Sequence, residues 1–157
     1  GGGRILGEVC HFVDLCSFVV GHPSVQVFAS ALSNDFGLDD SMTALIRYQD
    51  GSVANIHYLA RATSELSKER FEASAGGVTA ICDNFKQTRI MGAKSSEGVK
   101  NVNQDKGQAE ALREVSRAVL KGTGSPFSIE ELVDTSRVTF AILESIRSGA
   151  PVDIDRG

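Results

Sequence analysis

The sequence has little cysteine, little proline and no tryptophan: its 157 residues include three Cys, three Pro and no Trp. Cys10, Cys16 and Cys82 are odd in number and show no CxxC spacing, so neither a disulfide framework nor a zinc ribbon is expected. The simplest interpretation is three small buried hydrophobic side chains in a reducing, cytoplasmic setting. An adjacent Cys10–His11 nucleophilic pair is the alternative, but neighbouring helical side chains point about 100° apart.

An excess of either charge is also lacking. The chain carries 16 Lys and Arg against 20 Asp and Glu, a net charge of −4, so no nucleic-acid partner is expected. No apolar run approaches the roughly 20 residues of a membrane span. The hydrophobic content of 41% is too high for a disordered chain, so residues 1–157 predict a single globular domain. The chain begins with three glycines and no Met, which indicates either a cloning scar or a chain cut from a longer protein.

Alternation and helical periodicity predict most of the elements. An apolar stripe indicates a helix over residues 5–20, and alternating residues indicate a strand over 24–32, followed by a loop over 33–37. The pair Asp50-Gly51 lies between two alternating runs, which predicts a tight hairpin. Further strands are expected over 69–75, 78–83 and about 86–91, whereas residues 93–104 give no structural signal.

The last third of the sequence is predicted to be helical. One helix is expected over about 106–121, beginning at Lys106, and a second begins at the capping box Ser128-Ile129-Glu130-Glu131 and runs to about residue 147. In this second helix the residues expected to face a core are Leu132, Val133, Phe140 and Leu143. Residues 152–154 form a possible terminal edge strand. Consecutive strands with short turns imply an α+β fold with an open, mainly antiparallel sheet and helices on one face.

The first helix carries the residues that most suggest chemistry. Glu8, His11 and Asp14 recur every three residues along one side. Imidazole is suited to proton transfer near neutral pH, and a carboxylate one turn away could orient it. A solvated helix surface is the alternative. A metal site at Glu8-x-x-His11 is less favoured, because no second such pair occurs. His22 and His57 are interpreted as structural residues in a turn and on a sheet surface.

Several short segments, taken in order, resemble the C-terminal domain of the Gfo/Idh/MocA family of NAD(P)-dependent sugar and inositol oxidoreductases. The first is Gly1-Gly2-Gly3-Arg4-Ile5-Leu6-Gly7-Glu8-Val9-Cys10-His11-Phe12-Val13-Asp14-Leu15. The others are Asp39-Asp40, Tyr48-x-Asp50-Gly51-Ser52, Lys68 to Phe71, Gly76-Gly77, Asp105-Lys106-Gly107, Glu144-Ser145 and Gly149-Ala150-Pro151-Val152. Each segment is weak alone, but together they span nearly the whole chain.

The resemblance implies a glyceraldehyde-3-phosphate-dehydrogenase-like fold whose free sheet face packs against another subunit. It also implies that a separate N-terminal Rossmann domain, absent from residues 1–157, binds NAD or NADP and supplies a catalytic Lys. His11 matches the family's catalytic His, whereas the family's Asp falls on Gly7, and Glu8 is the adjacent acidic residue. His11 and Glu8 are therefore the expected catalytic residues. No cofactor-binding or metal-binding residue is expected in the chain itself.

Two functional hypotheses follow from the sequence. In the first, the chain is the substrate-binding and oligomerisation domain of an NAD(P)-dependent dehydrogenase. The full-length enzyme would act on a sugar, inositol or related polyol as a cytoplasmic homodimer, and the fragment would be inactive alone. In the second, the vacated Asp position marks a non-catalytic assembly or ligand-binding module derived from the same fold.

Overall fold

The computed structural model of the chain describes residues 3–34, 37–92 and 98–156, which form two compact units. Residues 1–61 and 127–157 make the first unit, and residues 62–126 make the second. The first unit contains η1 (Ile5–Val9), α1 (Cys10–Val20), β1 (Ser24–Asn34), β2 (Gly37–Tyr48), β3 (Val53–Tyr58), α3 (Ile129–Ser148) and β8 (Val152–Asp153). The second contains β4 (Arg70–Ala75), β5 (Val78–Asp83), β6 (Gln87–Met91), β7 (Gly98–Lys100) and α2 (Gln108–Lys121).

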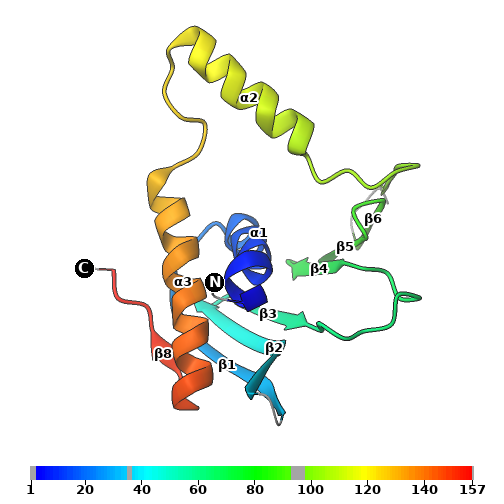
Figure 1. Ribbon diagram of the computed structural model, residues 1–157. Helices are drawn as coiled ribbons and strands as arrows, with labels where there is room; N and C mark the ends of the chain where they lie inside the picture. The colour runs from blue at the N-terminus through cyan, green and yellow to red at the C-terminus, as the bar shows by residue number, and fades with distance from the viewer. Residues whose placement is uncertain (1–2, 35–36, 93–97, 157) are drawn as a thin grey trace. The chain divides into compact units, whose positions relative to one another are not determined.

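The first unit is an antiparallel sheet of order β3-β2-β1-β8 with α1 and α3 on one face (Figure 1). Alternate residues of each strand point toward the helices, and these are the apolar ones. The buried strand residues are Val27, Ala29, Met42, Ala44, Ile46, Tyr48 and Ile56. The predicted Asp50-Gly51 hairpin is confirmed, since β2 and β3 pair antiparallel with Arg47 opposite Val53. The expected terminal strand is also confirmed, because β8 pairs with β1.

Among the described residues of the first unit, no helix covers the opposite face of this sheet, and that face carries both apolar and polar side chains. In the register of the three long strands, Phe28, Leu45 and Asn55 lie side by side, and Ser30, Thr43 and His57 form the next row. The Thr43 hydroxyl lies 3.0 Å from Nδ1 of His57, which confirms His57 as a sheet-surface residue. Phe28 remains 42% exposed on this face.

The helical segment over residues 5–20 buries part of the stripe that its periodicity predicts, through Val9 of η1 and Val13 and Cys16 of α1. It ends at Gly21, whose φ of 69° is the left-handed conformation that glycine adopts without a Cβ clash. The first turn differs from expectation, because residues Ile5–Val9 form a π-helical turn instead of an α-helical one. Such turns carry one extra residue and often mark functional sites.

The core-facing stripe predicted for α3 is wrong in part. Leu132, Val133 and Phe140 are exposed in the structure by 54%, 41% and 59%. The residues that α3 does bury lie toward its C-terminal half and are Val138, Thr139, Ala141, Ile142 and Ser145. The apolar residues of this helix therefore occupy more than one face, and only one of those faces meets the sheet.

The second unit is an antiparallel meander of order β4-β5-β6-β7. The short strand β7 lies in a stretch from which the sequence predicted nothing, and residues 93–97 lie outside the described residues. The predicted start of α2 is wrong, because Gly107 has a left-handed φ of 76° and the helix begins at Gln108. Lys106 thus precedes the helix, and its Nζ lies 2.6 Å from Oε1 of Glu69. Of the predicted loop over 33–37, residues 33–34 belong to β1 and Gly37 begins β2, whereas residues 35–36 lie outside the described residues.

The α+β class with antiparallel strands is confirmed, although the strands form two sheets. All three cysteines are free thiols, and burial raises the pKa of Cys16 to about 11. Among residues 3–34, 37–92 and 98–156, no helix is both long and apolar enough to cross a bilayer.

Candidate functional site

The segment that enters the first helix is fixed to the sheet by a small polar cluster. Gly3 has a φ of 65°, and a Cβ there would lie 2.9 Å from Oδ1 of Asp40, so the position requires glycine for both reasons. The same Asp40 oxygen accepts a hydrogen bond of 3.0 Å from the backbone N–H of Arg4. The Arg4 guanidinium donates to the Tyr58 hydroxyl at 3.2 Å. These contacts hold the start of the helix over strands β2 and β3.

A groove of about 480 Å³ lies between this first helical segment and α3. Its lining combines three apolar side chains with hydroxyl, thiol, imidazole and carboxylate groups. The lining residues are Leu6, Cys10, His11 and Asp14 from η1 and α1, and Leu132, Thr135, Ser136, Thr139 and Phe140 from α3. Its volume falls in the range of small-molecule sites, and its lining is richer in polar groups than such sites usually are.

The two walls of the groove are joined by a hydrogen bond. The Thr135 hydroxyl donates to Oδ1 of Asp14 over 3.2 Å, which links α3 to α1. Two further hydroxyls of α3 donate to carbonyls of their own helix: Ser136 to Leu132 at 3.0 Å and Thr139 to Thr135 at 2.7 Å. Every hydroxyl of the α3 wall therefore has its proton engaged.

The structure brings together two of the three polar residues predicted to share one side of the first helix. His11 and Asp14 both line the groove and are exposed, whereas Glu8 is exposed but is not a lining residue. Cys10 lines the groove next to His11. A Cβ at Gly7 would meet no atom within 4 Å, so the absence of a side chain there does not result from crowding.

The sequence did not predict that α3 would contribute to the site. The sequence held one signal of this contribution, because three hydroxyl residues lie among the apolar positions of that helix: Thr135, Ser136 and Thr139. Leu132 and Phe140 were assigned to a core, but they line the groove instead. In the described part of the chain, no group of three or more His, Cys, Asp and Glu side chains is arranged to hold a metal ion.

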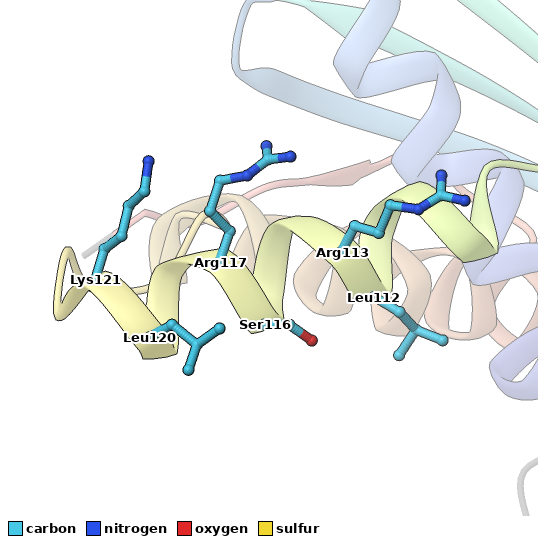
Figure 2. A pocket seen from close by; sticks show the side chains of 6 residues that line it. All are labelled: Leu112, Arg113, Ser116, Arg117, Leu120 and Lys121. Carbon is cyan, nitrogen blue, oxygen red and sulfur yellow. The ribbon is translucent and has the colours of Figure 1, made fainter.

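A second hollow, of about 450 Å³, lies on α2 in the other unit and is a surface feature of one helix. In Figure 2, Leu112, Ser116 and Leu120 project along one side of the helix, and Arg113, Arg117 and Lys121 along the other. Arg113 and Arg117 form ion pairs with Glu110 and Glu114, one turn before them. Since these side chains do not converge on a common point, the groove beside α1 is the better candidate site.

The first unit is an α+β domain in which two helices cover an antiparallel sheet and a groove lies between them. This architecture differs from that of a dinucleotide-binding domain, whose sheet is parallel. The family model of the Gfo/Idh/MocA C-terminal domain matches residues 1–79, which is half of the chain. The chain belongs to this family. The comparison with curated proteins gave no match.

Solved structures of oxidoreductases share this fold. A protein assigned as a myo-inositol dehydrogenase from Sinorhizobium meliloti 1021 aligns over 98% of this chain with a TM-score of 0.76 and 17% identity. A levoglucosan dehydrogenase solved with NADH and levoglucosan aligns over 96% with a TM-score of 0.77 and 15% identity. An aldose-aldose oxidoreductase from Caulobacter crescentus, solved with glycerol, aligns over 92% with a TM-score of 0.73 and 17% identity. The chain spans 50%, 50% and 45% of these proteins.

Proposed function

We propose that this domain binds the substrate of an NAD(P)-dependent oxidoreductase acting on a sugar, an inositol or a related polyol. The observation that carries the proposal is the placement of His11 and Asp14 together in the groove beside the first helix of a Gfo/Idh/MocA C-terminal domain. Proteins of the same fold that were solved with levoglucosan or glycerol support a polyhydroxylated ligand. The three free thiols favour a cytoplasmic setting.

In this proposal His11 acts as the general acid or base on the reacting oxygen of the substrate. The imidazole accepts the proton of the hydroxyl when the alcohol is oxidised, and the hydride of the same carbon would pass to the NAD(P)⁺ held by the other part of the protein. In the reverse direction the imidazole donates the proton to the carbonyl oxygen. Asp14, three residues later on the same helix, lines the groove with His11, and the hydrogen bond from Thr135 fixes its carboxylate. Glu8 remains a second candidate carboxylate, because it lies exposed three residues before His11.

The described residues do not fit a dinucleotide, so the domain would act with another part of the protein that binds NAD or NADP. All strand pairings among residues 24–34, 37–92, 98–100 and 152–153 are antiparallel. The unit that binds a pyrophosphate consists of a strand, a glycine-rich turn and a helix, and it occurs in parallel sheets. We therefore expect the chain alone to show no turnover and no tight NAD(P)H binding.

The test is the substitution His11→Asn in the protein that joins this domain to its dinucleotide-binding partner domain. Loss of a general acid or base lowers kcat by about 100-fold or more, measured from NAD(P)H absorbance with a panel of polyols. The matched control is His22→Asn, because His22 lies in the turn after α1 and does not line the groove. Asp14→Asn and Glu8→Gln in the same assay identify the carboxylate that supports His11. An unchanged kcat in His11→Asn would remove His11 from the mechanism.

A second candidate function is a non-catalytic assembly or ligand-binding module. The observation that favours it is Gly7, which offers no carboxylate at the family's acidic position although the space there is open. The reading frame upstream of Gly1 separates the two functions. A glycine-rich Rossmann turn and a Glu-Lys-Pro segment would support the oxidoreductase, and a frame without them would support the module.

A further inference from the structure

The α3 wall of the groove presents hydrogen-bond acceptors. A Ser or Thr hydroxyl has one proton and two lone pairs. The protons of Thr135, Ser136 and Thr139 are donated to Asp14 and to two carbonyls of α3. The oxygen atoms are left with lone pairs, and the Asp14 carboxylate also only accepts. Of the three hydroxyl residues Ser136 is the most exposed, whereas Thr139 is 2% exposed and forms the floor.

The charge of the groove favours the same kind of ligand as its acceptors do, namely a neutral donor of hydrogen bonds. Among the described residues that line it there is no Lys and no Arg, and Asp14 is its carboxylate. A ligand carrying its own carboxylate or phosphate would meet Asp14, and this domain itself lines the groove with no opposing guanidinium or ammonium group; like charges at short range repel. A neutral ligand rich in hydroxyl groups brings O–H donors and no charge.

The apolar part of the lining fits the carbon skeleton of such a ligand. Leu6, Leu132 and Phe140 line the same groove, and the latter two keep more than half of their surface exposed. Polyols and sugar rings have C–H faces as well as hydroxyl edges, and an exposed aromatic or aliphatic side chain packs against the former. The groove thus combines a C–H-binding surface with an acceptor wall.

We propose that Ser136 and Asp14 make this groove selective for neutral polyols against the corresponding sugar acids and sugar phosphates. Ser136 supplies the exposed acceptor oxygen for the ligand's hydroxyl groups, and Asp14 supplies the negative charge that disfavours an anionic ligand. This inference rests on the proposed function, since it assigns a substrate class to the groove that contains His11.

The test compares neutral and anionic ligands of matched skeleton. The two pairs are myo-inositol with myo-inositol 1-phosphate, and D-glucose with D-glucuronate, each titrated into the ¹⁵N-labelled chain. We expect the neutral members to shift the amide signals of His11, Asp14 and Ser136, with anionic members binding about tenfold more weakly. Ser136→Ala should weaken neutral binding about fivefold. Ser136→Lys, at an exposed position, should reverse the preference within each pair.

The controls separate this inference from the proposed function. Ser116→Ala removes an exposed hydroxyl from α2 and should leave all affinities unchanged. Binding of the anionic members as tightly as the neutral ones, or neutral binding that Ser136→Ala leaves unaltered, would overturn the selectivity while leaving the groove as the binding site. If neither member of either pair shifts the groove signals, both the selectivity and the proposed function fail.

Discussion

Tyr48 on β2 is a buried residue with a strongly displaced pKa. Tyr48 is 2% exposed, and burial raises its pKa to about 12. In the unfolded chain the pKa returns to about 10. Between these two values the folded state holds a proton that the unfolded state has released, so the free energy of unfolding falls as the pH rises.

The substitution Tyr48→Phe should remove this loss. Wild-type protein is expected to lose about 1 kcal/mol between pH 10 and pH 11 through this group, whereas Tyr48→Phe keeps a flatter profile. Urea unfolding at pH 8, 10 and 11 measures the difference. The matched control is Tyr58→Phe, which removes the only other tyrosine hydroxyl, a partner of Arg4. Cys16, whose pKa is also raised, leaves a residual slope in both variants. Parallel profiles for Tyr48→Phe and wild type would contradict the assignment.

The spacing of Glu8, His11 and Asp14 predicted a shared helix side, and the structure places only the last two in the groove. The difference has a local cause. The π turn at Ile5–Val9 changes the angle between successive residues, so positions before Cys10 are rotated relative to an ideal α-helix. No residue type in that turn predicts a π-helical conformation. The start of the helix is also held by contacts of Gly3 and Arg4 with Asp40, a residue 36 or more positions away in the sequence, which no local pattern predicts.

At the scale of elements, α3 combines a well-predicted start with a poorly predicted face. Its N-cap is confirmed, since the Ser128 hydroxyl accepts from the Glu131 N–H at 3.3 Å. The cap is encoded by four consecutive residues and needs no tertiary information. The buried face depends on where the 20-residue helix crosses the sheet. Leu132 and Phe140 line the groove, but their residue types are equally typical of a core.

Removing this cap should destabilise the first unit. Ser128→Ala leaves the Glu131 N–H without its side-chain acceptor, and we expect a loss of about 1 kcal/mol in the free energy of unfolding. Ser128→Asp keeps an acceptor at the same position and should retain most of the stability. Thermal unfolding followed by circular dichroism measures both variants. Equal melting temperatures for Ser128→Ala and wild type would show that the cap contributes nothing to α3.

At the scale of the whole molecule, the hairpins were predictable and their assembly was not. A short turn between two strands predicts that they pair as a hairpin, as Asp50-Gly51 does for β2 and β3. Between β3 and β4 lie the residues from 59 to 69, which are neither helix nor strand, and no local signal says whether the sheet continues across them. In the structure, the strands before and after this segment belong to two four-stranded sheets, and each sheet pairs only its own strands.

We propose the face of the β3-β2-β1-β8 sheet opposite α1 and α3 as the contact between two copies of the chain. A row of Phe28, Leu45 and Asn55 beside a row of Ser30, Thr43 and His57 combines apolar area with neutral hydrogen-bonding groups, as interfaces between copies do. We expect a dimer in sedimentation equilibrium that Phe28→Lys converts to a monomer, because a buried ammonium lacks a partner there. Phe18→Lys on α1 is the control, since Phe18 is 82% exposed on the helix layer of the same unit. A wild-type monomer at about 100 μM, where a typical interface of micromolar affinity would be filled, would exclude this face as the contact.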